Sequence, residues 1–531
     1  MGRRLMVRIV SVLATAALLL GAGCRCSRTP PPTSAPSPAP SVRLYLLSTG
    51  AGALEPCGCV KDMLGGVDHF AALVANESAS SPRRLVLGAG PMLFSDPVVD
   101  AKRKAQDAWK AQAFYDVLHG TGLAAWTPGA NDFALGKDFI EKLPGSADVL
   151  VAANLEGVGV KPARVIELGG ERVGVAGVTV PRFPAPDASG VAVGDAAAGL
   201  ERAGKWLGEQ GARIRVALVA MPRGDALRLA ENVKGFHLVL VGKPAEQGET
   251  NDPPTPPVLV GETLVVEAPN HLQAVAAVDF FVKDGRYSFA DGSGIADEER
   301  RQSLRLRIDD LKARLDKARG ASSDLAARRR DLERAKSELA ELSKPRPSPA
   351  GSFFRYRYVE IREQLGSEPR AAARLAEYYR QVNEHNREAF KDALPPPVPP
   401  GRSGYVGVDA CTSCHAEERT FWNGTSHAKA YPTLANQNKQ FNLECIGCHV
   451  TGYEAPGGST VAHVDKLENV QCEVCHGPGS RHAEKPEERG LIVVKPEKSL
   501  CASQCHHPPH VKPSWSVDDA WPHVIGKGHG G

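Results

Sequence analysis

The chain has 531 residues, 42% of them hydrophobic and 24% charged, and this ordinary globular composition excludes wholesale disorder. Its 64 Lys and Arg balance 61 Asp and Glu, and the net charge of +3 argues against a protein that binds nucleic acid. Cysteine and histidine are unevenly spread: eight of 12 cysteines and 11 of 16 histidines follow residue 410. We therefore expect the chemistry of the protein in its C-terminal tail.

The first segment has the features of an export signal. A basic start precedes an apolar run from Ile9 to Leu20, which is short for a membrane span. The residues that end at Cys24 resemble a bacterial lipoprotein processing site, although the leucine lies four residues before the cysteine rather than three. We predict an export signal over residues 1–23 and a Pro/Ser linker over residues 24–41, with a lipid on Cys24. Alternatively, Cys24 and Cys26 are ordinary linker cysteines.

A layered α/β domain is predicted over residues 42–295, because short apolar runs alternate there with amphipathic stretches. Runs of this length that are rich in branched residues are typical of buried strands. The expected strands are Leu44–Leu47, Arg84–Leu87, Val149–Ala153, Val173–Val178, Val216–Ala220, His237–Val241 and Thr263–Glu267. The expected helices include Ala105–His119 and Ala197–Gln210.

The order of these runs, and a block from Leu54 to Cys59 followed by Gly65-Gly66, resemble the 5'-nucleotidase-like branch of the calcineurin-type metallophosphoesterases. That resemblance implies two metal ions held by Asp, His and Asn in the loops after the strands. Here the corresponding positions read Ser48–Gly52, Gly88–Pro91, Gly129–Asp132, Met221 and Gly242–Ala245. We therefore predict an inactive phosphoesterase-like domain; a repurposed binding surface remains the alternative.

Cys57 and Cys59 lie within that block, separated by one glycine. Two cysteines at this spacing can share a metal ion, but they make only a strained disulfide. The first interpretation is a tight turn with two half-buried thiols. A redox or ligand-binding site is the alternative.

A helical spacer is predicted over residues 296–400. Apolar residues recur there at spacings of three and four, which indicates a short coiled coil. They are Leu304, Ile308, Leu311, Leu315, Leu325, Leu332, Leu339 and Leu342. Gly320 is a possible helix end, so we expect an antiparallel hairpin rather than one long helix. A further helix is expected from about Tyr356 to Leu394, before a Pro-rich end; a homodimer formed through the leucine stripe is the functional alternative.

The tail, residues 401–531, holds three segments of the pattern Cys-x-x-Cys-His. They are Cys411, Cys414 and His415; Cys445, Cys448 and His449; and Cys472, Cys475 and His476. Two thiols at this spacing can bind the vinyl groups on one edge of a haem, and the adjacent histidine can bind its iron. Zinc or disulfides would also suit paired cysteines, but neither explains a histidine after every second cysteine.

A fourth segment runs from Cys501 to Cys505 and His506 and has one extra residue between its cysteines. We predict a fourth haem there, with a structural disulfide as the alternative. Histidines outside the motifs are candidates for the second axial ligand of each iron, and an ordinary surface histidine is the alternative for each. These seven are His427, His463, His482, His507, His510, His523 and His529, of which we select His427, His482, His510 and His523.

The tail also resembles the cytochrome c-554 family of multihaem cytochromes over residues 402–531. The segments that carry the resemblance are Tyr405–Gly407, Ser426–Ala430, Cys445–Gly452 and Asn469–His482. It implies four closely packed haems, with His427 and His482 as distal ligands and one iron sometimes five-coordinate. The lengthened fourth motif and the displaced His523 depart from the family pattern.

Together these observations predict a multidomain protein: an α/β layered domain, a helical coiled-coil hairpin and a small, mostly α or irregular cytochrome domain. We expect an exported, lipid-anchored cytochrome of the periplasm or outer membrane of a Gram-negative bacterium. It would carry electrons between redox partner proteins through three or four haem c groups. The alternatives are a haem-dependent reductase of a small nitrogen or oxygen species, and a phosphoesterase or nucleotidase with an attached cytochrome. The α/β domain could also dock a redox partner.

Overall fold

The computed structural model describes residues 39–56, 63–180, 190–244, 251–317, 323–344, 348–507, 511 and 515–526. The predictions for the export signal, Cys24, the Cys57 and Cys59 pair and His510 lie outside the described residues. Within the described ranges, no helix combines the length and the apolar character needed to span a membrane.

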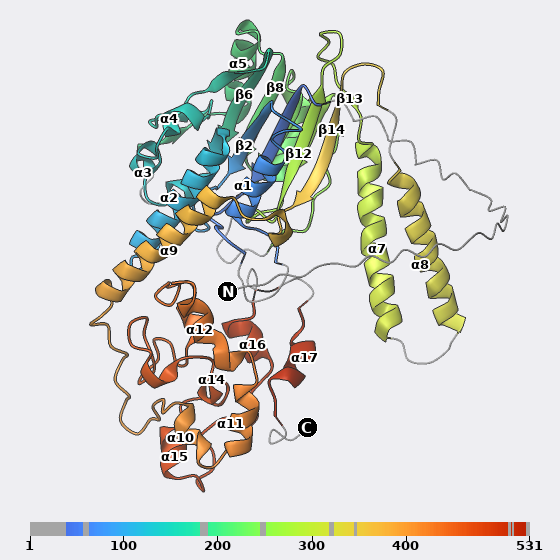
Figure 1. Ribbon diagram of the computed structural model, residues 1–531. Coiled ribbons are helices and arrows are strands. Elements are labelled where there is room, and N and C mark those ends of the chain that lie inside the picture. Colours follow the sequence, from blue (N-terminus) through green and yellow to red (C-terminus); the bar gives the residue numbers. More distant parts are fainter. Residues whose placement is uncertain are drawn as a thin grey trace, which may run out of the picture. The chain divides into compact units, whose positions relative to one another are not determined.

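Two six-stranded sheets form the centre of the α/β part (Figure 1). The first, in spatial order, contains β13 (Ala290–Asp291), β14 (Phe353–Glu360), β12 (Ala274–Phe281), β1 (Val42–Ser48), β2 (Arg84–Gly90) and β3 (Leu123–Pro128). The second contains β10 (Val258–Val260), β11 (Thr263–Glu267), β9 (Leu238–Gly242), β8 (Ile214–Ala220), β6 (Glu171–Thr179) and β5 (Ala163–Leu168). A separate pair joins β4 (Leu155–Glu156) and β7 (Ala192–Val193).

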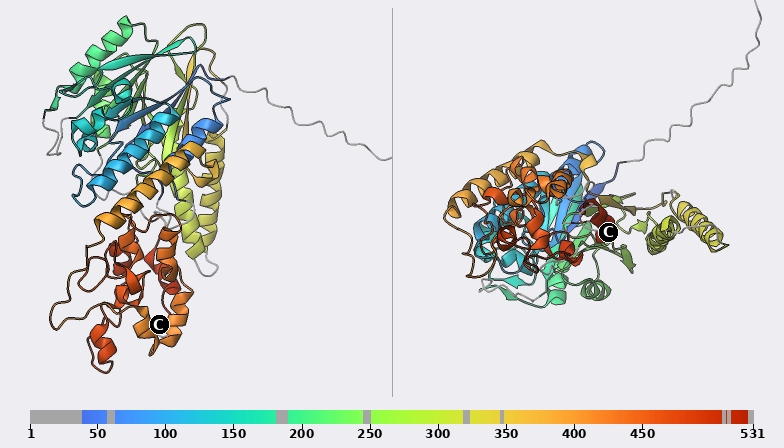
Figure 2. Two further views of the ribbon diagram at one scale, coloured as in Figure 1. Left: turned by 60° about the vertical axis from the view of Figure 1, so that its left-hand side comes forward. Right: turned by 90° about the horizontal axis from the view of Figure 1, so that it is seen from below.

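Helices cover the outer faces of both sheets, so the layers run helix, sheet, sheet, helix (Figures 1 and 2). The first sheet carries α1 (Val67–Asn76), α2 (Lys104–Thr121) and α9 (Pro369–Ala389), and the second carries α5 (Ala196–Glu209) and α6 (Arg223–Asn232). Side chains alternate between layers because a strand has a period of two. Tyr45 and Leu47 of β1 pack toward the helices, whereas Leu44 and Leu46 pack toward the second sheet. The predicted α/β layered architecture is thus confirmed.

Local signals account for the ends of the main helices. The Asp195 side chain accepts a hydrogen bond from the Ala198 N–H at 2.7 Å and caps α5. Glu368 caps α9 in the same way, and Pro369 follows at the first helical position. Gly122 ends α2 with a φ of 100°, a conformation that glycine adopts without strain. Short elements of the same part are η1 (Ala130–Phe133), α3 (Lys137–Glu141), α4 (Ser146–Val149), η2 (Ile295–Asp297) and η3 (Glu363–Leu365).

The structure corrects two predictions about the segment after the hairpin. This segment belongs to the α/β part, which was predicted to end at residue 295, and it is not the start of the helix expected from Tyr356. Residues Phe353–Glu360 form β14, which pairs antiparallel with β12 inside the first sheet. Aromatic and charged side chains alternate along the segment, and this period of two belongs to a strand. Helix α9 also covers the first sheet. The α/β part is therefore interrupted by the hairpin and resumes after it.

The expected strand Val149–Ala153 is also wrong. Helix α4 ends at Val149, and only isolated bridges at Leu150 and Val151 follow it. A short apolar run at the end of a helix is indistinguishable from a buried strand by periodicity alone. Strands β3, β5, β10 and β12 were not among the predicted ones.

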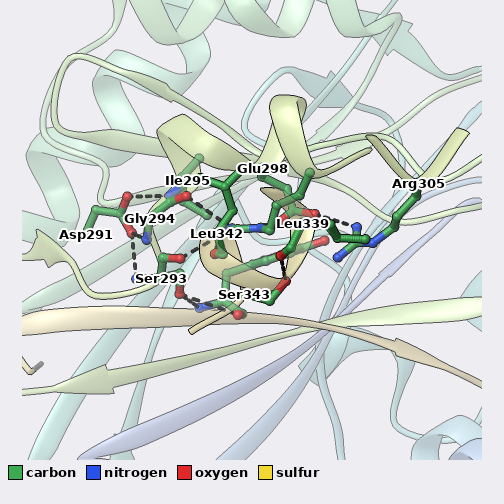
Figure 3. A network of polar contacts seen from close by, with 11 residues as sticks. Asp291, Ser293, Gly294, Ile295, Glu298, Arg305, Leu339, Leu342 and Ser343 are labelled. Atoms are coloured by element: carbon green, nitrogen blue, oxygen red, sulfur yellow. Dashed lines mark hydrogen bonds and ion pairs between the residues drawn. The ribbon is translucent and has the colours of Figure 1, made fainter. Parts of the chain in front are cut away.

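The hairpin consists of α7 (Glu298–Lys317) and α8 (Ser323–Leu342), which lie side by side in Figures 1 and 2. Arg300 pairs with Glu338 and Arg307 with Asp331, so the two helices run antiparallel. Leu304, Ile308, Leu332 and Ala335 are buried between them. At the base of the hairpin, the Asp291 carboxylate accepts the backbone N–H groups of Ser293, Gly294 and Ile295 (Figure 3).

The tail is built from short helices and turns. Its helices are α10 (Val408–Thr412), α11 (Ala416–Asn423), α12 (Ala430–Ala435), α13 (Ile446–His449), α14 (Cys472–His476), α15 (Ser480–Glu484), α16 (Ser499–Gln504) and α17 (Val517–Ala520). Its 3₁₀ turns are η4 (His427–Lys429), η5 (Asp465–Leu467) and η6 (Trp521–His523). Among the described residues of the tail, one apolar cluster has four buried members, Leu434, Ile446, Val450 and Val461, and Val408, Leu467 and Val511 are buried outside it.

Candidate functional site

Each cysteine motif of the tail lies on or at the end of a short helix: α10, α13, α14 and α16. Side chains three and four positions apart share one face of a helix, so both sulfurs and the imidazole can face one group. In the first motif, the His415 N–H donates to the Cys411 carbonyl at 3.0 Å, which continues the helical turn through the histidine. None of the eight described cysteines forms a disulfide.

The fourth motif absorbs its extra residue in a wider turn. The His506 N–H donates to the Cys501 carbonyl at 2.8 Å, a bond that spans five residues instead of four. Such a π-type turn accommodates one inserted residue without breaking the helix. Cys501, Cys505 and His506 thereby stay together.

Two histidine pairs bring a motif histidine next to a histidine from elsewhere in the tail. The ring centres of His415 and His482 are 6.4 Å apart, and those of His427 and His506 are 6.2 Å apart. Two imidazoles that bind one metal ion from opposite sides, with metal–nitrogen distances of about 2 Å, have ring centres roughly 6 Å apart. Both pairs therefore have the spacing of two axial ligands of one iron.

The other two motif histidines are oriented by hydrogen bonds to the main chain. Nδ1 of His449 lies 2.6 Å from the Ala430 carbonyl, and Nδ1 of His476 lies 2.6 Å from the Val493 carbonyl. A carbonyl oxygen only accepts, so each Nδ1 carries the proton and each Nε2 keeps its lone pair. This tautomer is the one that presents Nε2 to a metal ion.

The remaining histidines differ in their surroundings. Burial, and then His506, lower the pKa of His427, which favours the neutral imidazole that a metal ion requires. Nε2 of His463 donates to the Lys391 carbonyl at 2.6 Å and is therefore engaged by the main chain. His523 lies exposed in η6, and within the described part of the chain no ring contact or hydrogen bond joins it to a motif histidine.

The four motifs lie close together. The Cys411 and Cys472 thiols shift each other's pKa, raising that of Cys411 and lowering that of Cys472, so the first motif lies near the third. The Cys448 sulfur lies 3.7 Å from the Gln504 carbonyl, which links the second motif to the fourth. Burial, and then Cys501, raise the pKa of the Cys475 thiol to about 11.

Two buried side chains hold the first and third motifs together, and the sequence patterns did not assign them this role. The Glu473 carboxylate, inside the third motif, accepts the N–H groups of Val406, Gly407 and Gly479 at 2.8–3.2 Å. The Gln471 amide accepts the Val408 N–H at 2.7 Å. Residues between two motif cysteines are unconstrained by the motif itself, so only the folded chain reveals this anchor.

The positions that resemble phosphoesterase metal loops form internal hydrogen bonds. Ser48 Oγ donates to the Val241 carbonyl at 2.6 Å, and Thr49 Oγ1 donates to the Lys243 carbonyl at 2.8 Å. The Asp132 carboxylate accepts the N–H groups of Met92, Leu93 and Gly129, each at 2.8 Å. Burial raises the pKa of Asp132 to about 7, although these three bonds act in the opposite direction.

The carboxyl ends of β2 and β9 approach each other closely at the same edge. A Cβ on Gly242 would lie 2.0 Å from the Ala89 carbonyl oxygen, so only glycine fits there. Across the described residues, no cluster of three or more His, Cys, Asp or Glu side chains is arranged to hold a bare metal ion. The inactivity of this domain stays a prediction.

Comparison with known proteins finds a similarity in the tail. Residues 410–477 match the family described as cytochrome c554 and c-prime. Cytochrome c-554 of Nitrosomonas europaea is 35% identical over 91 residues, which cover 14% of this chain and 39% of that protein. The chain thus spans about two fifths of the length of the curated relative that it matches.

Solved structures with a similar backbone include phosphoesterases. A 5'-nucleotidase precursor of Thermus thermophilus is 18% identical, with a TM-score of 0.44, over 64% of this chain and 59% of that one. A sulfate thiohydrolase of Thermus thermophilus is 15% identical, with a TM-score of 0.44, over 66% and 62% of the two chains. The calcineurin-like phosphoesterase YfkN of Bacillus subtilis is 17% identical, with a TM-score of 0.38, over 57% and 99%.

Haem c fits the residues present in the tail. The sulfurs are paired on short helices, two imidazole pairs have the spacing of axial ligands, and two further imidazoles present Nε2. The family match covers the first, second and third motifs. Residues 410–477 are thus similar to the cytochrome c554 and c-prime family, and the residues of this segment suit haem c.

Proposed function

We propose that the protein is an exported electron carrier whose tail holds three or four haem c groups and passes electrons between redox partner proteins. The observation that carries this proposal is the pairing of His415 with His482 and of His427 with His506. An iron with two imidazole ligands has no open position for a substrate, and this arrangement suits electron transfer rather than bond-making.

Haem c supplies a one-electron couple at its iron when it is bound. The residues of the chain hold, orient and pack it. Cys411, Cys414 and their counterparts in the other motifs would hold the group through their sulfurs, and the histidines would bind its iron through nitrogen. The contacts between motifs keep successive groups close, as electron passage along the tail requires.

The haem content and ligation can be tested on protein matured with a c-type assembly system. The pyridine haemochrome spectrum should give about four haems per chain, and three would demote Cys501 and Cys505 to a structural pair. In His482→Ala and His427→Ala, one haem each should change from low spin to high spin in the electron paramagnetic resonance spectrum. The matched control is His463→Ala, since His463 is engaged by the Lys391 carbonyl. Absence of haem, or unchanged spectra in both variants, would overturn the proposal.

We also propose export and a lipid anchor on Cys24, which would tether the protein to a periplasmic or outer membrane. The basic start, the apolar run and the small residues before Cys24 support this location. Mass spectrometry of the mature N-terminus tests it directly. A lipid-modified Cys24 is expected, and Cys24→Ser should release the protein from the membrane fraction.

A further inference from the structure

Side chains of the α/β part form hydrogen bonds with the main chain just before the second cysteine motif. Gln106 of α2 and Asn386 of α9 are 1% and 2% exposed, and both face the segment from Phe441 to Glu444. This segment ends directly before Cys445. Two helices of one part of the molecule thus determine where a cofactor-binding motif of the other part begins.

The grip consists of three buried amides, Gln106, Asn386 and Asn442, which we call the amide clasp. Gln106 Oε1 accepts from Asn386 Nδ2 and from the Leu443 N–H, each at 3.0 Å, while Gln106 Nε2 donates to Asn442 Oδ1 at 3.2 Å. Asn386 Nδ2 also donates to the Phe441 carbonyl at 2.9 Å. Removal of any member would leave buried polar groups without a partner, which is unfavourable in a site shielded from water.

An ion pair lies beside the clasp. Lys110 Nζ contacts both carboxylate oxygens of Glu444 at 2.8 and 3.0 Å, and the side chains are 22% and 29% exposed. Burial alone would lower the pKa of Lys110, but Glu444 raises it, so the lysine remains a cation. Asp107, one turn of α2 away, also faces this group, and Arg103 pairs with Asp107.

Resting on the proposed function, we propose that Gln106, Asn386 and Lys110 are positioning residues for the second haem motif, and that the Lys110 charge sets the reduction potential of its haem. The α/β part is then a working component of the redox unit rather than a spacer. Charge and hydrogen bonding near a bound haem are established determinants of its potential.

The charge of Lys110 should raise the reduction potential of the neighbouring haem. Reduction adds an electron, and a nearby cation in a partly buried site stabilises the reduced form. Lys110→Met leaves the Glu444 carboxylate unbalanced, so reduction of the neighbouring haem becomes less favourable. The double variant Lys110→Met with Glu444→Gln removes both charges and should return the potential toward the wild-type value.

The test is a spectropotentiometric titration of the holoprotein, with each haem followed separately by its magnetic resonance signal. Lys110→Met should lower the midpoint potential of one haem, Lys110→Arg should preserve it, and Gln106→Met should shift the signal of the same haem. The matched control is Lys102→Met, because Lys102 forms an exposed ion pair with Glu454 between the same parts of the molecule. Unchanged potentials in Lys110→Met and Gln106→Met would overturn the inference.

A separate measurement distinguishes failure of this inference from failure of the proposed function. Peptide mass spectrometry of the wild-type protein shows whether Cys445 and Cys448 carry haem. Without haem on that peptide, the proposed function itself fails at this motif. With haem present and all potentials unmoved, only the positioning role fails.

Discussion

The α/β part and the tail are stabilised by different means. Three apolar clusters fill the layers of the α/β part, and residues such as Trp126, Phe114 and Leu218 are fully buried in them. In the described part of the tail, the apolar cluster has four buried members, and eight cysteines and several histidines lie around it. Apolar burial can stabilise the first part by itself, whereas the second must gain stability from a bound group. Where both meet, buried polar contacts such as the amide clasp occur beside the apolar packing of Phe390 against the tail.

The largest effect is expected when haem attachment is prevented, because this should unfold the tail and leave the α/β part folded. In a chain produced without haem attachment, the tail should be unfolded while the α/β part remains folded, because only the tail depends on the bound group. Limited proteolysis with mass mapping should then find cleavage throughout residues 402–526 and protection of the sheets. A protease-resistant tail in the haem-free chain would contradict the comparison.

A substitution in the apolar core should lower the stability of the α/β part. Trp126 is fully buried and its Nε1 donates to the Gly90 carbonyl at 3.2 Å. Trp126→Ala should lower the unfolding free energy of the α/β part by about 3–5 kcal/mol, through lost burial and a cavity. Urea unfolding followed by circular dichroism measures the change. Trp206→Ala is the matched control, since Trp206 is 42% exposed and should cost far less.

Acid should weaken the α/β part through His237. Its Nδ1 accepts the Arg215 N–H at 3.0 Å, and burial followed by the Arg215 charge lowers its pKa to about 4. The unfolded chain, with a histidine pKa of about 6.5, binds the proton first, so stability is lost as pH falls from about 6.5 to 4. The contribution of this one group reaches up to about 3 kcal/mol. In His237→Asn, which keeps an acceptor but does not titrate, unfolding curves across this range should lose that part of the slope; an equal slope in both proteins would refute the assignment.

The smallest effect is expected at the anchor between the first and third motifs. Glu473→Gln replaces one acceptor oxygen with a donor that faces backbone N–H groups, and should destabilise the tail by about 1–3 kcal/mol. Thermal unfolding of the holoprotein, followed by the haem absorbance, provides the measurement. Glu454→Gln, at an exposed position, is the control and should leave the transition unchanged.

Local patterns in the sequence determined the chemistry of the tail and most of the layers. The three Cys-x-x-Cys-His segments predict haem c. Short apolar runs rich in branched residues predict β1, β2, β6, β8, β9 and β11, and amphipathic stretches predict α2 and α5. Both signals are contained within a few neighbouring residues. The tail match to the cytochrome c554 and c-prime family agrees with that prediction.

Tertiary structure alone decided how distant segments meet. Strand β14 pairs with β12 in the first sheet, although the whole hairpin separates the two strands in the sequence. In the same way, His427 lies beside His506, which is far from it along the tail. The amide clasp likewise joins Gln106 with Asn442. Such contacts leave no periodic trace in the sequence, because each is selected by the packing of the complete chain rather than by its neighbours along it.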